Sequence, residues 1–138
     1  MPRPGSKRSP ARFSASLLLL LAGAGIERPL EDRRGDPIRG EAVVTSQSST
    51  CTLCHAGPFP RPELQGDVGP DLRGVGGRLE AAELRERLVA ASRVTAGTVM
   101  PDFFRTEGLA RVGPAWRGRP ILSAQEIEDA VAFLGSLR

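Results

Sequence analysis

The sequence predicts an all-α domain in which three helices are separated by long loops. Three segments carry apolar residues at helical spacing, while the segments between them are rich in proline and glycine, and no alternating strand pattern is present. The length of 138 residues suits one small domain. Only 4% of the residues are aromatic although 40% are hydrophobic. We therefore expect something other than aromatic side chains to fill part of the core.

The first 24 residues predict a secretory signal peptide. Four basic residues without an acidic one precede the apolar run 17–22, and small residues follow at 22–24. The apolar run is much shorter than the ~20 residues that cross a bilayer. We expect export, cleavage after Ala24 and no membrane anchor after cleavage. The alternatives are a short amphipathic or disordered tail and, less favoured, an uncleaved anchor.

The charge left after cleavage argues against nucleic-acid binding. Without the leader the chain has 15 Arg, 16 acidic residues and no Lys, a net charge of −1. Nucleic-acid binding proteins need a basic face, which scattered arginines do not provide. We therefore expect no nucleic-acid partner.

The mature chain begins with a segment that predicts a flexible linker over residues 25–35, followed by the domain proper over 36–138. The linker is charged, contains proline and glycine, and has no apolar period. Asp36 and Pro37 then predict the N-cap and first position of a short helix leading to Cys51. The residues expected near one face of this helix are Ile38, Ala42 and Val43.

Two further helices follow, separated by loops over 56–78 and 93–120. The second helix is expected from Leu79 to about Ser92, and its apolar stripe is Leu84, Leu88 and Ala91. The charged residues expected to face water on it are Glu83, Arg85, Glu86 and Arg87. Ser123 and Glu126 predict a capping box that opens a third helix running to the C-terminus. Its inward face is expected to be Ile127, Ala130, Val131, Phe133 and Leu134.

Cys51, Cys54 and His55 form CxxCH, the attachment signature of a c-type haem. Two thiols at this spacing can reach the two vinyl groups of one porphyrin, while the adjacent imidazole ligates the iron. A redox dithiol, a structural disulfide and half of a zinc site are the alternatives. Zinc would need further Cys or His ligands, and the chain has none. One covalently bound haem c is therefore the favoured prediction.

Met100 is the predicted second axial ligand of the iron. The mature chain offers no second His, no Lys, no Tyr and no further Cys, and Met100 is its only thioether. The alternative is a buried methionine that fills a gap in the core. An iron held by His55 and Met100 suits electron transfer, because His/Met is a recognised axial pair of cytochromes c.

The run from Gly69 to Arg78 resembles the GPxLxGxxGR run of class I cytochromes c. The resemblance implies a small class I cytochrome c-like domain with three or more helices around the haem. It also implies that the Pro70 carbonyl accepts the Nδ1 proton of His55, that Leu72 packs on the porphyrin and that Arg78 pairs with a haem propionate. Trp116 is a further candidate donor to a propionate, with a core position as the alternative.

Longer segments are similar to the SoxX family of a periplasmic thiosulfate-oxidising system. They are CTLCHAGPFP, GPDLRGVGGRLEAAELRERLV, TVMPDFFRTEGLARV and AWRGRPILSAQEIEDAVAFLGSLR, and together they span nearly the whole of residues 51–138. The resemblance implies a periplasmic monohaem subunit that pairs with a SoxA cytochrome. It further implies that the complex couples thiosulfate oxidatively to a cysteine of a carrier protein, and that this subunit passes the electrons to a small cytochrome c.

The chain itself shows no independent catalytic site. Both cysteines are assigned to the haem, and neither a Ser/His arrangement nor a pair of carboxylates is evident. The sulfur chemistry of a cysteine S-thiosulfotransferase-type complex is therefore expected in the partner. The competing hypotheses are a free soluble cytochrome c shuttle, a haem-free thiol-disulfide protein, and a gas-sensing or peroxidatic cytochrome. Residues 103–120 carry a local charge of +3 and are a candidate docking face, with a solvated loop as the alternative.

Overall fold

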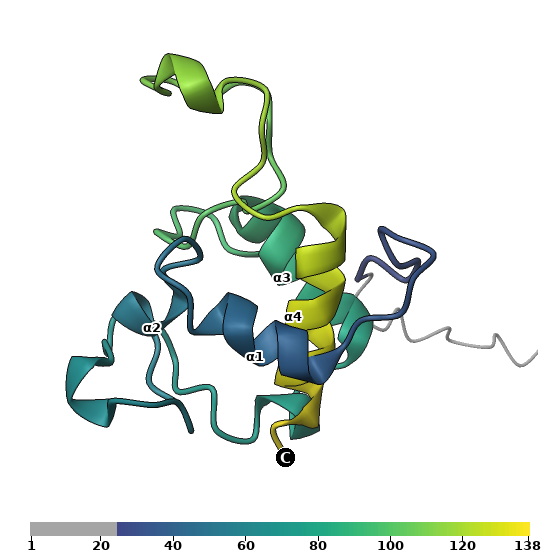
Figure 1. Cartoon of the computed structure of the whole chain (residues 1–138), viewed down its shortest axis with the longest axis vertical. Helices are drawn as coiled ribbons and strands as arrows, with labels where there is room; N and C mark the ends of the chain where they lie inside the picture. Colours follow the sequence, from purple (N-terminus) through teal and green to yellow (C-terminus); the bar gives the residue numbers. More distant parts are fainter. Residues whose placement is uncertain (1–24) are drawn as a thin grey trace, which may run out of the picture.

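A computed structural model describes residues 25–138, so the predicted signal peptide lies outside the described residues. The elements are helices α1 (Pro37–Val44), α2 (Cys51–Cys54), α3 (Ala81–Val94) and α4 (Ala124–Ser136), with short 3₁₀ helices η1 (Pro62–Leu64), η2 (Val75–Gly77) and η3 (Pro114–Trp116). Within residues 25–138 there is no strand. The all-α prediction is confirmed (Figure 1).

Helix α1 begins as predicted, but it packs by a different face. The Asp36 side chain accepts from the backbone N–H groups of Ile38 and Arg39, and Pro37 follows the cap. The expected face is wrong at Ile38 and Ala42, which are exposed, whereas Val43 packs against the core as predicted and Gly40 and Val44 are buried. At Gly40 the backbones of α1 and α4 approach so closely that an added Cβ would lie 1.9 Å from the Asp129 carbonyl oxygen. Because Gly40 has no side chain, α1 can approach α4 closely by the face that carries it. A pattern of apolar residues does not predict this face.

Helix α3 buries the predicted stripe of Leu84, Leu88 and Ala91. The helix begins with a capping box, in which the side chains of Glu80 and Glu83 each accept a hydrogen bond from the backbone N–H of the other residue. The backbone leaves helical geometry at Ala90, so the last turn is offset. Arg85, which the sequence predicted to face water, is instead 5% exposed and therefore buried.

The Arg85 guanidinium forms a buried ion pair with Glu128 of α4. Its Nε lies 2.7 Å from Glu128 Oε1 and its Nη2 lies 2.9 Å from Oε2. Glu128 is 4% exposed, and Asp129 beside it is 2% exposed. Asp129 accepts two hydrogen bonds of 2.8 Å from the Arg39 guanidinium on α1. Buried charges are tolerated when they are paired and hydrogen-bonded, which explains why α4 can hide two carboxylates inside a small domain.

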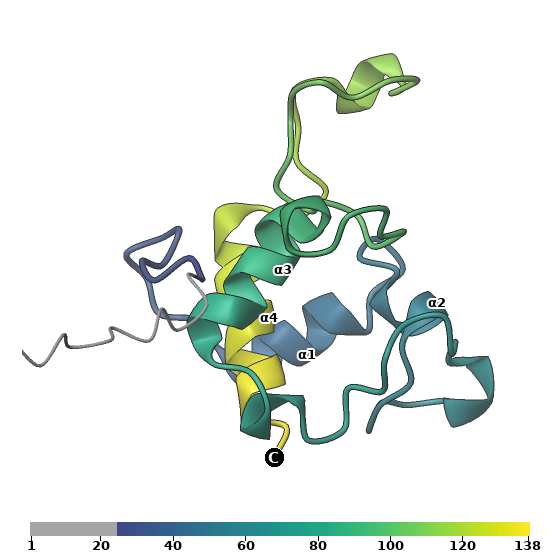
Figure 2. The ribbon, with the colours of Figure 1, turned by 180° about the vertical axis from the view of Figure 1, so that it is seen from behind.

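Helix α4 otherwise follows the prediction. Ser123 and Glu126 form the capping box, and all five residues of the predicted inward face are buried. This face packs on α1 and α3, and the end of α4 lies beside η2. The core that results joins residues of all these elements with Phe59 and Phe103 from the loops. Figure 2 shows the same three long helices from behind, with α2 to one side.

The segment 25–35, predicted as a flexible linker, is packed against α3 and α4. The Ile26 N–H donates to the Ala82 carbonyl, and the Ile26 carbonyl accepts from Arg85 Nη1 at 2.6 Å. The Leu30 N–H donates to Glu128 Oε1 at 2.9 Å, and the Leu30 side chain packs against the core. The buried Arg85–Glu128 pair therefore also attaches this segment, a contact that no local pattern encodes.

Two irregular regions extend from the helical body. Residues 55–78 run beside α2 and return along the base of α4, whereas a segment around η3 projects from the opposite end (Figures 1 and 2). None of the helices over residues 25–138 is long and apolar enough to span a membrane.

Candidate functional site

Cys51 and Cys54 open and close the single turn of α2. Both thiols are free and half-buried. The Cys51 Sγ lies 3.8 Å from the Ser49 carbonyl oxygen, and burial raises the pKa of this thiol despite that contact. A Cys-x-x-Cys pair on one turn presents two sulfur atoms to the same neighbourhood, as attachment of one planar group at two points requires.

His55 follows α2 in an extended conformation, and its ring is held from two sides. The Nδ1 atom lies 2.7 Å from the Pro70 carbonyl oxygen. Because a carbonyl can only accept, Nδ1 carries the proton, and the Nε2 lone pair is left to bind a metal. The ring also lies against Gly69, where an added Cβ would be 2.3 Å from His55 Cε1. The Gly69–Pro70 pair therefore fixes both the orientation and the tautomer of the imidazole.

Backbone hydrogen bonds hold the 66–72 loop against the α2 turn. The N–H groups of Gly66, Gly69 and Leu72 donate to the carbonyls of Thr52, Cys54 and Ala56 at 2.9, 2.7 and 2.8 Å. These bonds place Pro70 beside His55 without help from a regular element. The motif that resembles class I cytochromes c is thus joined to the CxxCH segment through the main chain.

The predicted second ligand, Met100, lies on the loop that follows α3. Its side chain is half-buried and packs against the hydrophobic core, as does that of Leu72. The Met100 N–H donates to Thr98 Oγ1 at 3.1 Å, and the Phe103 N–H donates to the Leu88 carbonyl at 3.0 Å. The backbone on either side of Met100 is therefore fixed, by the Thr98 side chain before it and by the hydrogen bond from Phe103 to α3 after it.

Arg78 holds its own loop. Its Nη1 and Nη2 donate to the carbonyls of Arg73 and Asp71 at 2.6 and 2.9 Å, and the residue is exposed. These bonds close the turn that precedes η2. Contact of Arg78 with a propionate, which the resemblance implies, stays a prediction.

Trp116 lies apart from the other predicted site residues. Its side chain is 65% exposed and belongs to η3. In both ribbon views η3 is at the far end of the projecting segment and well separated from α2. The structure does not bring Trp116 together with His55.

The residues around His55 fit a haem group. Within residues 25–138 there is no group of three or more His, Cys, Asp or Glu side chains that could hold a metal ion. The α2 turn and His55 provide instead one oriented imidazole and two free thiols, and Met100, on the loop after α3, is the one thioether of residues 25–138. Imidazole and thioether are haem axial ligands, while a closed zinc site needs four nitrogen, sulfur or oxygen donors. The close approach of the Gly69 backbone to the His55 imidazole holds this ring in one plane.

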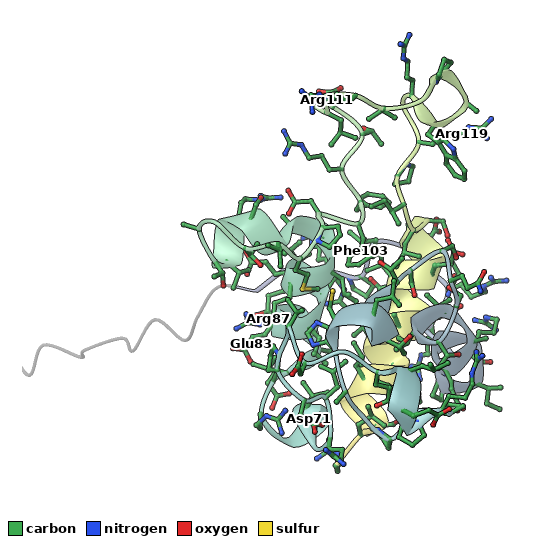
Figure 3. All side chains as sticks on the ribbon, turned by 90° about the vertical axis from the view of Figure 1, so that its left-hand side faces the viewer. Asp71, Glu83, Arg87, Phe103, Arg111 and Arg119 are labelled. Atoms are coloured by element: carbon green, nitrogen blue, oxygen red, sulfur yellow. The ribbon has the colours of Figure 1, made fainter. Side chains whose placement is uncertain are left out.

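Sequence reasoning missed three residues of functional interest. Gly69 belonged to the recognised motif but had no assigned role. Gln65 accepts from the Gly57 N–H at 2.8 Å and donates to the Phe59 carbonyl at 2.9 Å, which closes the loop after His55. A glutamine in a proline-rich loop carries no signal for this. Arg87 on α3 was expected to face water, yet its Nε is buried and lacks a hydrogen-bond partner among the described residues (Figure 3).

Comparisons with known proteins identify the family. No protein-family model matches the chain. No curated protein matches it. Among solved structures, a chain of the crystal structure of SoxXA from P. pantotrophus is similar, with 36% sequence identity and a TM-score of 0.75. The match covers 83% of this chain and 90% of that chain, so the two are of comparable length. The protein therefore belongs to the SoxX family and has the small all-α fold of a cytochrome c.

Proposed function

We propose that this protein is the electron-transfer subunit of a SoxXA-type thiosulfate-oxidising complex. The observation that carries the proposal is the His55 ring, whose Nδ1 is bound to the Pro70 carbonyl at 2.7 Å and whose Nε2 is left to bind iron. Two free thiols within the same helical turn and membership of the SoxX family support it.

The residues that would hold one haem c are Cys51 and Cys54 by covalent attachment, and His55 and Met100 as axial ligands. A bound haem supplies one-electron transfer at its iron. Pro70 keeps the imidazole in one tautomer and one orientation, in which Nε2 is left to bind the iron. By the resemblance to class I cytochromes c, Leu72 would pack on the porphyrin, and Arg78 would donate to a propionate through the N–H groups that its loop bonds leave free.

The division of labour between subunits follows from the side chains available. With Cys51 and Cys54 committed to attachment, no thiol of the mature chain is left to carry sulfur. The partner, a SoxA-type cytochrome, would join thiosulfate to a carrier-protein cysteine with release of two electrons. This chain would pass these electrons to a small cytochrome c. Export by the signal peptide would place the mature protein in the periplasm.

The test is to follow electron flow in the purified complex of this chain with its SoxA-type partner. Thiosulfate and the reduced carrier protein are added anaerobically, and the visible bands of this subunit are recorded by stopped flow. We expect the bands to change to the reduced form and to return when oxidised small cytochrome c is added. The matched control omits only the carrier protein and should show no reduction.

Two results would overturn the proposal. Reduction confined to the partner's bands would remove this chain from the electron path. Equal reduction of the isolated chain without its partner would identify a free shuttle instead of a subunit.

A further inference from the structure

Residues 104–121 form a projecting segment with a closed base. The Leu122 N–H donates to the Phe103 carbonyl at 3.0 Å, and these two residues are 1% and 2% exposed. The base is therefore part of the core, while the segment itself extends into solvent (Figures 1 and 2). Loops of this kind, with ends fixed by a rigid scaffold, commonly carry binding surfaces.

The projecting segment exposes large apolar side chains around a pocket. Leu109 is 45% exposed, Trp116 is 65% exposed and Ile121 is 48% exposed. These three residues line a pocket of about 370 Å³ together with two arginines, Arg105 and Arg119. An exposed tryptophan beside an open apolar pocket is the arrangement found where proteins bind one another, because such side chains supply most of the binding energy.

The charge of the segment selects an acidic partner. It contains four arginines and one acidic residue, within a mature chain whose net charge is −1. Arg105 is fixed to the carbonyls of Glu107 and Gly108 at 2.8 and 3.1 Å. Within residues 25–138, Arg111, Arg117 and Arg119 form no ion pair. Figure 3 shows Arg111 and Arg119 at different places on the segment.

Two other occupants fit less well. A second copy bound about a two-fold axis would bring two positive segments together, which is unfavourable. A small electron acceptor binds briefly through a small interface, whereas an exposed tryptophan beside an apolar pocket suits the more hydrophobic interface of a permanent complex.

We propose that residues 104–121 dock the SoxA-type partner, which inserts an apolar side chain beside Trp116 and presents carboxylates to Arg117 and Arg119. This inference rests on the proposed function. Attraction between the two charged patches would speed association, and the apolar contact would slow dissociation.

The experiment measures binding of the mature holoprotein to the SoxA-type cytochrome encoded in the same genome, by calorimetry at two salt concentrations. Trp116→Ala should weaken binding about 30-fold, the loss expected of a central interface tryptophan. Arg117→Glu combined with Arg119→Glu should weaken it at low salt, with a smaller effect at high salt. Haem spectra should be unchanged, since both sites are exposed.

Two variants outside the segment serve as matched controls. Ile38→Ala removes a highly exposed apolar side chain on α1, and Arg28→Glu reverses the charge of an exposed arginine. Both should bind like the wild type. If all variants bind like the wild type, the docking surface lies elsewhere and the proposed function stands. If the wild-type chain itself does not bind the partner, the proposed function fails and the docking inference with it. A self-association of the chain that Trp116→Ala abolishes would assign the surface to a second copy.

Discussion

The helical body and the region around His55 are stabilised in different ways. The body, formed by α1, α3 and α4, combines an apolar core with the buried Arg85–Glu128 ion pair and with an ion pair between the exposed Arg39 and the buried Asp129. The His55 region is held mainly by backbone hydrogen bonds and close glycine contacts. Changes in the body should therefore cost folding stability, whereas changes around His55 should alter the site with a smaller cost.

The largest effect is expected from breaking the buried pair of α3 and α4. Glu128→Gln leaves the Arg85 guanidinium buried without its counter-charge, which typically costs about 3–5 kcal/mol. Urea denaturation of the mature protein measures the loss. The double variant Arg85→Met with Glu128→Leu should be less destabilised, because no charge is left unpaired. A double variant as unstable as the single one would show that packing, and not charge, dominates.

A methyl group at the α1–α4 crossing should have the next largest effect. Gly40→Ala places a Cβ 1.9 Å from the Asp129 carbonyl oxygen and must push the helices apart, at a cost of about 1–3 kcal/mol. Gly135→Ala on α4 is the matched control, since nothing lies within 4 Å of its added Cβ. Thermal unfolding compares the two variants. Equal melting temperatures would contradict the close approach of α1 and α4.

The corresponding change in the other region is Gly69→Ala, which should displace the His55 ring. Its added Cβ would lie 2.3 Å from Cε1, so the bond to Pro70 should lengthen or break. We expect a loss of stability of about 1 kcal/mol, the net worth of one hydrogen bond, together with altered visible bands of the holoprotein. Gly77→Ala has no atom within 4 Å of its Cβ and should alter neither property. Unchanged visible bands in Gly69→Ala would show that Gly69 does not position the His55 ring.

The smallest expected effect concerns acid stability. Although burial opposes it, hydrogen bonds from Arg39, the Asp36 backbone and Gln125 lower the pKa of Asp129 below its ordinary value. The unfolded chain then takes up a proton at higher pH than the folded chain does. The contribution of Asp129 is thus complete at neutral pH and is lost as the pH falls from about 4. Denaturation as a function of pH should show a shallower decline for Asp129→Asn. The same slope as the wild type would contradict the assignment.

The two regions also differ in how far the sequence predicts them. Periodicity and capping residues predict the buried faces of α3 and α4, and CxxCH predicts the chemical identity of the site. Arg85 and Gly40 could not be predicted, because their partners are 43 residues or more away and a helical pattern assigns arginine to the surface. The packing of residues 25–35 could not be predicted for the same reason, because this segment is held by Arg85 and Glu128, which are distant in the sequence. Gly69 belongs to the motif that resembles class I cytochromes c, but the motif does not show that this glycine lies against the His55 ring.

The central claim is that His55 and Met100 of this chain ligate one covalently attached haem. The most direct measurement is the visible spectrum of the mature protein, purified from a periplasm that attaches haem, in both redox states. We expect sharp reduced bands and, in the oxidised protein, the weak methionine-to-iron band near ~700 nm. Met100→Leu should keep the haem and lose that band. A wild-type protein with haem but without the band would remove Met100 from the iron, and a protein without haem would contradict the account.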